Sequence, residues 1–397
     1  MEWKSNNLEN LLDAIIDYRG KTPTKTSVGI PLVTAKIIKN GVINEFNEFI
    51  AEEDYDRWMV RGLPKPGDVV LTTEAPLGEV AQLDERKIAL AQRVVCLRGK
   101  SNILDNTYLK YYFLSNYGKK KLKSRESGTT VTGIKQSELR QVEVRYPSFG
   151  NQKRIASILS SLDDKIAVNK KICENLEAQA QALFKHWFVD FAPFKDGKFV
   201  ESELGLIPEG WRVGTLSEVA DLVKTSIKPQ GNTLYSHYSI PAFDNNQTPS
   251  CDSGESIKSS KFAIQDSVIM LSKLNPEHKR IWFIQNVGSN AVCSTEFLPF
   301  YAKDRGQSVF VYCYLNCPQN YREIANGAKG TTNSHQRLDA NAVLTRKLAY
   351  KNDVVTRFSK LVGDFMKQKD IALQENLRLA TLRDTLLPKL MSGEIKI

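Results

Sequence analysis

Two glycine–threonine loops carry the residues of this chain that are best suited to bind phosphate. One loop holds Gly128-Thr129-Thr130, and the other holds Gly330-Thr331-Thr332. Glycine lets the backbone approach a phosphate closely, and threonine hydroxyls can donate hydrogen bonds to its oxygens. The pattern predicts two phosphate-binding loops, while a purely structural turn remains the alternative reading of the same residues.

The sequence contains none of the motifs that would place common nucleotide chemistry in this chain. It has no Asn/Asp-Pro-Pro-aromatic motif of adenine methylation, no G-x-x-x-x-G-K-[ST] loop and no H-E-x-x-H motif. His186, His237 and His278 have no triad-like context. His335 differs because it follows a glycine–threonine loop in GTTNSHQR, where it could contact a ligand. We therefore expect no catalytic residue and no metal site.

The charge of the chain indicates an anionic partner and is concentrated in two blocks. The net charge is +10 and the pI is about 9.1. Residues 101–150 hold nine Lys/Arg against four Asp/Glu, and residues 301–350 hold seven against three. The blocks lie about 200 residues apart, which indicates a repeated basic domain.

Length and composition favour a protein of two or more domains in the cytoplasm. The chain has 397 residues, of which 41% are hydrophobic. No segment is apolar enough to cross a bilayer, and the first residues do not form a signal peptide, so we expect no membrane partner. The six cysteines lack zinc-site spacing and predict reduced thiols.

The chain carries an internal repeat that spans both halves. Trp3 in EWKSNNLENLLD matches Trp211 in GWRVGTLSEVAD, and RVVCLRG matches NAVCSTE, which pairs Cys96 with Cys293. KPGDVVLTTEAPLGEVAQL is echoed by IQDSVIMLSKLNPEHKRIWFI, and SGTTVTGIKQSELRQVEV by KGTTNSHQRLDANAVLTR. Alternating apolar runs with turn signals predict strands in each half, and NTYLKYYFLSNYGKKKLKS predicts one short helix.

A long helix is predicted after each half. Residues 151–188 contain no proline or glycine, with Asn151 as the expected N-cap. Apolar or small residues recur at alternating spacings of four and three, with Asn169 as the polar exception: Ile155, Leu159, Leu162, Ile166, Asn169, Cys173, Leu176, Ala180 and Leu183. The C-terminal region carries a similar stripe, which Gly363 and Pro388 make less regular: Phe358, Val362, Phe365, Ala372, Leu379, Leu382 and Leu386.

The two stripes are predicted to bury each other as an antiparallel pair, because the second half must run back along the first helix. The alternative is that each helix packs only on its own domain. As a pair, the helices would hold two basic domains apart. If each domain contacts DNA, that distance selects the spacing of two half-sites, which lie about one helical turn or roughly 34 Å apart when they face the same side.

Three segments resemble the S (specificity) subunit of type I restriction–modification enzymes, and the resemblance covers essentially the whole chain. They are GLIPEGWRVGTLSEVA, NQKRIASILSSLDDKIAVNKKICENLEAQAQALFKHWFVDF and LRDTLLPKLMSGEI. The resemblance implies an α+β protein with two mixed α/β target recognition domains, separated by two long helices that form an antiparallel coiled-coil spacer. The expected bounds are 1–150 and 191–350 for the domains, and 151–190 and 351–397 for the helices.

The resemblance also implies partners and cofactors. Each recognition domain would read one half of an interrupted target in double-stranded DNA, and the helices would dock two methyltransferase (M) subunits. S-adenosylmethionine is expected on the M subunits. ATP and Mg²⁺ are expected on a restriction (R) subunit, which adds translocation and cleavage. No cofactor is expected in this chain.

The predicted DNA-binding residues lie in or beside expected loops, next to glycine or within basic runs. In the first half they are Lys36, Lys39, Thr72, Thr73, Lys121, Arg125, Gly128, Thr129, Thr130 and Lys135. In the second half they are Lys273, Lys279, Arg280, Lys329, Gly330, Thr331, Thr332, Ser334, His335 and Arg337. The alternative for the run GKKKLKSR is a solvated helix face.

The aromatic segment FKHWFVDFAPF predicts a partner contact through Trp187 and Phe188, either with an M subunit or with the recognition domains. The alternative is that it closes the junction between domain and helix. Two other functions also remain open: a self-sufficient DNA-modifying enzyme or nuclease with an unrecognised active site, and a coiled-coil scaffold with no DNA role.

Overall fold

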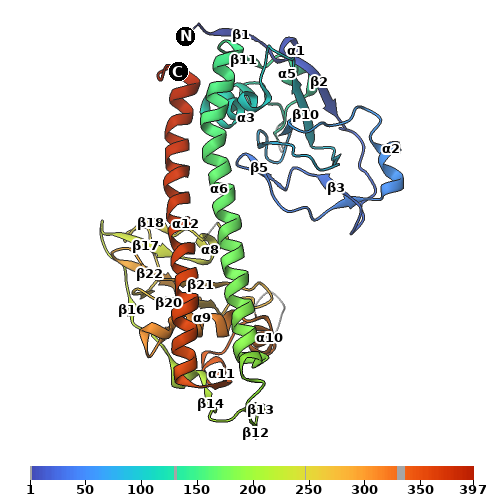
Figure 1. The fold of residues 1–397 in the computed structure, drawn as a ribbon. Coiled ribbons are helices and arrows are strands. Elements are labelled where there is room, and N and C mark those ends of the chain that lie inside the picture. The colour runs from blue at the N-terminus through green and yellow to red at the C-terminus, as the bar shows by residue number, and fades with distance from the viewer. Residues whose placement is uncertain (1, 129–131, 246, 329–335) are drawn as a thin grey trace. The chain divides into compact units, whose positions relative to one another are not determined.

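The computed structural model describes residues 2–128, 132–245, 247–328 and 336–397 (Figure 1). The chain forms two compact units. Unit 1 contains Met1–Val168 and Glu375–Ile397, and unit 2 contains Asn169–Gln374. Both ends of the chain therefore belong to unit 1.

A four-stranded antiparallel sheet forms the centre of unit 1. Its order is β2 (Leu12–Asp17), β10 (Val94–Gly99), β7 (Val69–Thr72) and β8 (Val80–Gln82). All four residues of β7 are buried, because successive side chains enter different cores. Val69 and Leu71 pack with helix α3 (Asn106–Leu114), whereas Val70 packs in a second core with β3 (Ile30–Val33).

Smaller elements complete unit 1. The sheets are β6 (Phe49–Ile50)–β3–β9 (Ala89–Leu90), β4 (Ile38–Lys39)–β5 (Val42–Ile43) and β1 (Lys4–Asn7)–β11 (Glu143–Tyr146). The helices are α1 (Leu8–Leu11), η1 (Glu52–Asp54), α2 (Tyr55–Trp58), α4 (Asn116–Lys123) and α5 (Gln136–Arg140).

The single short helix predicted over NTYLKYYFLSNYGKKKLKS is wrong, because α3 and α4 divide at Ser115. The Ser115 hydroxyl accepts a hydrogen bond from the Gly118 amide at 3.2 Å and caps the second helix. A Cβ at Gly118 would lie 2.1 Å from the Tyr112 carbonyl oxygen, so this tight turn requires glycine.

Unit 2 contains an equivalent central sheet and a larger second sheet. The central order is β15 (Ala220–Leu222), β23 (Phe297–Ala302), β20 (Val268–Ser272) and β21 (Ile281–Ile284). The five-stranded sheet is β16 (Ser226–Ile227), β19 (Lys261–Ala263), β22 (Ala291–Ser294), β17 (Leu234–Tyr238) and β18 (Ser250–Ser253).

Short pairs and helices surround these two sheets. The paired strands are β12 (Phe199–Ser202)–β13 (Gly205–Pro208) and β14 (Arg212–Thr215)–β24 (Lys347–Tyr350). The helices are η2 (Lys185–Val189), η3 (Ala192–Phe194), α7 (Leu216–Val219), α8 (Ile240–Asp244), η4 (Arg305–Gln307), α9 (Ser308–Asn316), α10 (Pro318–Asn326) and α11 (Ala340–Leu344).

The internal repeat is confirmed in the connectivity of the two central sheets. Strands β2-β10-β7-β8 and β15-β23-β20-β21 have the same order, and each unit adds an antiparallel pair at its start. The Leu8 amide donates to the Val142 carbonyl at 2.9 Å, and the Leu216 amide donates to the Arg346 carbonyl at 2.8 Å. The predicted match of EWKSNNLENLLD with GWRVGTLSEVAD pairs Leu8 with Leu216, and it therefore extends to their backbone hydrogen bonds.

The predicted equivalence of Cys96 and Cys293 is wrong. Cys96 lies in β10, opposite Val70, whereas Cys293 lies in β22 of the five-stranded sheet. The residue opposite Met270 in unit 2 is Pro299 of β23, which is the counterpart of Cys96. The sequences of β10 and β22 match locally because both are buried and contain a Val-Cys pair. The two strands nevertheless occupy different places in the sheets of their units, so they are not equivalent.

The two long helices are α6 (Phe149–Phe184) and α12 (Asn352–Ser392). Helix α6 starts two residues before the expected Asn151 cap, and the π-helical turn η2 follows its last residue. Pro388 lies within α12 without ending it. The assignment of the flanking ranges as recognition domains stays a prediction.

The helices run antiparallel within each unit. In unit 1 Asp163 pairs with Arg383 at 2.8 Å, and Lys165 pairs with Glu375 at 3.4 Å. In unit 2 Glu177 pairs with Lys369 at 2.6 Å, and the ring centroid of Phe184 lies 5.9 Å from that of Phe358. Partner numbers fall on α12 as they rise on α6, which confirms the antiparallel prediction.

Most of the predicted stripe on α6 is buried, including Ile155, Leu159, Asn169 and Ala180. The stripe predicted on α12 is wrong at Leu382, whose relative exposure is 47%. The neighbouring Arg383 is directed toward α6 instead, where it bonds to Asp163. A charged residue thus takes a position that the apolar pattern assigned to leucine.

Replacing Phe184 with alanine should destabilise unit 2 by about 3–5 kcal/mol, because it removes a buried ring from an aromatic cluster. Phe184 is 2% exposed, and its ring centroid lies 5.2 Å from Phe188 and 5.9 Å from Phe358. Urea unfolding followed by tryptophan fluorescence measures the change. Ile371→Ala, at a site 67% exposed in the same unit, is the control and should change stability by about 0.5 kcal/mol or less. Equal effects of both substitutions would contradict this packing.

Candidate nucleic-acid interface

Three backbone segments meet at the base of the first glycine–threonine loop. The Thr73 amide donates to the Arg93 carbonyl at 3.0 Å, and the Ile134 amide donates to the Thr73 carbonyl at 3.0 Å. Ser127 and Gly133 exchange two backbone hydrogen bonds of 2.8 and 3.0 Å, which close the loop between them. We name this arrangement of Thr73, Arg93 and Ile134 the unit 1 junction.

The loop base approaches the turn after β7 so closely that a side chain would be crowded. A Cβ on Gly133 would lie 3.0 Å from the Thr73 carbonyl oxygen and 3.1 Å from the Glu74 Cβ. Arg93 and Glu74 form an ion pair of 2.8 Å beside it. The sequence pattern singled out Gly128, which has φ +113°, but the close contact is made by Gly133.

The same backbone arrangement occurs in unit 2. The Lys273 amide donates to the Glu296 carbonyl at 2.9 Å, and the Leu338 amide donates to the Lys273 carbonyl at 2.9 Å. Lys273, Glu296 and Leu338 form the unit 2 junction. An ion pair of 3.2 Å links Arg337 to Glu296. Each junction joins the turn after the third strand of the central sheet, the residue before the second strand, and the residue before the N-cap of a short helix.

Part of the predicted set lies outside the described residues: Thr129, Thr130, Lys329, Gly330, Thr331, Thr332, Ser334 and His335. Ile134 and Leu338, which belong to the two junctions, follow these loops in the sequence.

The predicted threonines of unit 1 are buried. The Thr72 hydroxyl donates to the Pro76 carbonyl at 2.6 Å and accepts from the Glu79 amide at 2.9 Å, so it stabilises the turn. Thr73 is 2% exposed, and its hydroxyl has no hydrogen-bond partner among the described residues.

The predicted basic residues of unit 1 divide into exposed and paired groups. Lys36, Lys39 and Lys135 are exposed, and Lys135 is the N-cap residue of α5. Lys121 bonds to Glu143, and this bond raises the pKa of Lys121 and lowers the pKa of Glu143. Arg125 pairs with Glu138 at 3.0 Å. Exposed lysines are therefore the better placed group for phosphate contacts.

Most of the predicted basic residues of unit 2 already have partners within the protein. The Lys279 ammonium donates to the Asn316 carbonyl at 2.6 Å. Arg280 forms two hydrogen bonds to Asp244, at 2.8 and 2.9 Å, and these bonds raise the pKa of the guanidinium. Arg337 pairs with Glu296, and Lys273 contributes its backbone to the junction.

The sequence did not single out Arg19, Arg93 or the acidic residues at the junctions. Arg19 donates to the Ile134 carbonyl and forms an ion pair of 2.5 Å with Asp17. The partners Arg19 and Ile134 are 115 positions apart. No local spacing indicates such a contact, so these residues could not be found from the pattern.

A basic surface lies on α4. Leu122 is buried, whereas Lys119, Lys120 and Lys123 are exposed. This matches the amphipathic alternative for GKKKLKSR, in which the lysines form a solvated helix face.

The aromatic segment after α6 lies in the core of unit 2. Phe188 is 8% exposed, and its ring centroid lies 4.9 Å from Phe310 and 5.1 Å from Phe358. Trp187 is half-buried, and its ring centroid lies 5.9 Å from that of Phe358. This packing agrees with the alternative that the segment closes the junction between domain and helix. A partner contact through Trp187 and Phe188 stays a prediction.

The residues that the structure describes form neither a metal-binding cluster nor a helix suited to span a membrane. No group of three or more His, Cys, Asp or Glu side chains is arranged there to hold a metal ion. Among the described helices, none combines the length and the apolar character that a membrane span needs.

Comparison with known proteins finds similarity to type I restriction specificity proteins. Residues 2–178 match the type I restriction modification DNA specificity domain. The specificity subunit of the type I restriction enzyme MjaIX of Methanocaldococcus jannaschii is 29% identical over 391 residues, covering 93% of this chain and 87% of the relative. The MjaVIII specificity subunit of the same organism is 27% identical over 192 residues, covering 48% and 42%.

The fold also matches a solved structure. The S subunit of a type I restriction–modification system from M. genitalium aligns with a TM-score of 0.57 at 17% identity, covering 98% of this chain and 96% of that one. This confirms the predicted fold class, a mixed α/β protein with long helices. In sequence and in fold, the chain is similar to type I restriction–modification specificity subunits.

Proposed function

We propose that this chain directs a type I restriction–modification complex to an interrupted target in double-stranded DNA, with one half read by each unit. The observation that carries the proposal is the repeated junction, in which Thr73 and Lys273 make the same two backbone hydrogen bonds. In the sequence, Gly128-Thr129-Thr130 precedes Ile134 of one junction, and Gly330-Thr331-Thr332 precedes Leu338 of the other. The two junctions share the same backbone hydrogen bonds but carry different side chains, which suits the recognition of two different half-sites.

The chemistry is proposed to belong to partner subunits. Two M subunits dock on α6 and α12 and carry S-adenosylmethionine for adenine methylation, and R subunits use ATP and Mg²⁺ for translocation and cleavage. We place the complex in the cytoplasm. The six cysteines are all free thiols, which suits a reducing compartment.

DNA binding is proposed to combine two kinds of contact. Exposed lysines, among them Lys36, Lys39 and Lys135, bind phosphates and hold each unit on the duplex. Side chains on the loops then contact base edges in the major groove, where each base pair presents a distinct pattern of donors and acceptors.

Mapping methylated adenines tests the proposal directly. The chain is expressed with the M subunit encoded beside it, and the host genome is sequenced for methylation. A two-part motif with a fixed gap is expected. A contiguous motif would show that one unit reads DNA alone, and the absence of methylation from an assembled complex would reject the proposal.

Gly133→Val should relax or abolish reading of one half of that motif and leave the other half intact. The added side chain cannot fit against Thr73 without moving the loop base. Gly150→Ala is the control, because no atom lies within 4 Å of the position of its Cβ. Methylation maps of both variants make the measurement. An unchanged motif with Gly133→Val would remove the unit 1 junction from the interface.

Lys135→Ala should weaken DNA binding evenly across sequences. The loss of one phosphate contact should reduce the slope of log K against log salt by about 0.9. Fluorescence anisotropy of the assembled complex at several salt concentrations measures it. Lys185→Ala is the matched control, since the Lys185 ammonium bonds to Asp190 at 2.7 Å. Equal slopes for Lys135→Ala and the wild type would exclude this contact.

A further inference from the structure

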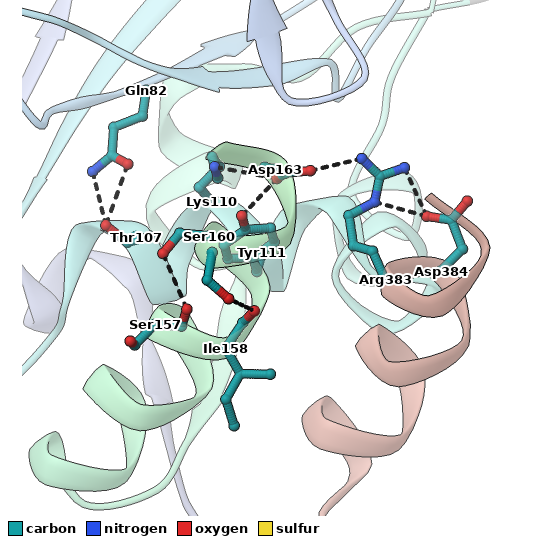
Figure 2. Close-up of polar contacts among 11 residues, drawn as sticks. Gln82, Thr107, Lys110, Tyr111, Ser157, Ile158, Ser160, Asp163, Arg383 and Asp384 are labelled. Atoms are coloured by element: carbon teal, nitrogen blue, oxygen red, sulfur yellow. Dashed lines mark hydrogen bonds and ion pairs between the residues drawn. The ribbon is translucent and has the colours of Figure 1, made fainter. Parts of the chain in front are cut away.

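In unit 1 a single carboxylate on α6 bonds to two other helices (Figure 2). The Tyr111 hydroxyl of α3 donates to one oxygen of Asp163 at 2.6 Å, and Arg383 of α12 donates to the other oxygen at 2.8 Å. Lys110 of α3 lies 3.8 Å from the same carboxylate. Asp163 therefore links the helix that packs on the central sheet to both long helices.

Unit 2 contains a carboxylate with the same set of links. Asn316 of α9 donates to one oxygen of Glu177 at 2.8 Å, and Lys369 of α12 donates to the other at 2.6 Å. Helix α9 follows β23 as α3 follows β10, so the two helices have the same place in the repeat. One acidic side chain thus joins α3 to α6 and α12 in unit 1, and one joins α9 to α6 and α12 in unit 2.

The two sets do not follow from the internal repeat by itself. A strict repeat would exchange the roles of α6 and α12 between units, but both acids lie on α6 and both bases lie on α12. Asp163 and Glu177 are fourteen residues apart, as are Lys369 and Arg383. This spacing is two heptads in the sequence.

The environment of each carboxylate makes the links strong. Asp163 and Arg383 are 24% and 25% exposed, and Glu177 and Lys369 are 23% and 22% exposed. Burial disfavours the charge of Glu177, but the ion pair with Lys369 and the polar side chains of Tyr312 and Gln181 together outweigh it, so the pKa of Glu177 lies below its ordinary value. Charge-assisted hydrogen bonds in such places are shorter and stronger than neutral ones.

We propose that Asp163 and Glu177 are positioning residues. In each unit they hold the central sheet and its helix, α3 or α9, as one body in one orientation on the paired helices α6 and α12. This orientation sets how strictly the complex selects the gap between half-sites. The inference rests on the proposed function. A body that turned about α6 would have to break the bond from Tyr111 or Asn316. Loss of that bond lets each body adopt more orientations, and half-sites at neighbouring gaps become acceptable.

The test uses the full chain assembled with its M subunits. Substrates carry both half-sites with gaps that vary by one base pair, and initial methylation rates are measured for each. Tyr111→Phe with Asn316→Ala removes the hydrogen bonds that these two side chains donate to Asp163 and Glu177, and it keeps the Lys110–Asp163 contact and both α6–α12 ion pairs. Lys165→Ala is the control, because it removes an ion pair between α6 and α12 whose side chains are 48% and 43% exposed.

The double variant should lower the ratio of rates at the preferred and neighbouring gaps by about tenfold or more, while base preference in each half-site stays unchanged; this corresponds to about 1.4 kcal/mol. Lys165→Ala should retain the wild-type ratio. A wild-type ratio in the double variant would overturn the inference, as would equal relaxation in the control. A wild-type complex with no preferred gap would instead reject the proposed function, and the inference with it.

Asp163→Ala with Glu177→Ala provides a second comparison. It removes the links to both partner helices, so relaxation should be at least as large as in the first variant. If this variant relaxes the gap while Tyr111→Phe with Asn316→Ala does not, pairing of the long helices controls the gap and the proposed role of the α3 and α9 bonds is wrong. Circular dichroism verifies folding in each case.

Discussion

The return of α12 along α6 is the constraint on which the rest of the structure depends. An amphipathic helix of this length cannot bury its apolar stripe on a small domain by itself, and a second stripe covers it. The return also brings the last residues of the chain into unit 1. Leu390 and Met391 are 2% and 6% exposed and pack in the same core as Ile155 and Leu159.

Unit 1 is therefore built from both the first and the last residues of the chain. Strand β1 pairs with β11 at the start of α6, and Gly393 follows the end of α12. A Cβ on Gly393 would lie 2.6 Å from the Trp3 indole nitrogen, so the first and last turns approach through a glycine. Changes at Leu390, Met391 or Gly393 are therefore expected to affect the core of unit 1 as well as the helices.

The repeat keeps backbone hydrogen bonds and changes side chains. Thr73 and Lys273 occupy equivalent positions and make equivalent bonds, as do Arg93 and Glu296. Backbone donors and acceptors are the same for most residue types, so a frame built from them tolerates different side chains. Such a frame can present different recognition chemistry in the two units without a change of fold. Ion pairs such as Arg280–Asp244 also show that the net charge overstates the basic surface available to DNA.

Local patterns in the sequence determined the long helices, their antiparallel pairing and the internal repeat. These features depend on heptad spacing and on ordered matches, both of which are visible in one dimension. Tertiary structure decided which residues meet. Asp163 and Arg383 are 220 positions apart, and Glu177 and Lys369 are 192 apart. Arg383 bonds toward α6 while the predicted Leu382 is exposed, and Cys96 corresponds to Pro299. Periodicity specifies which face of an element is apolar, but the partner of a charged or hydrogen-bonding group depends on how distant segments pack.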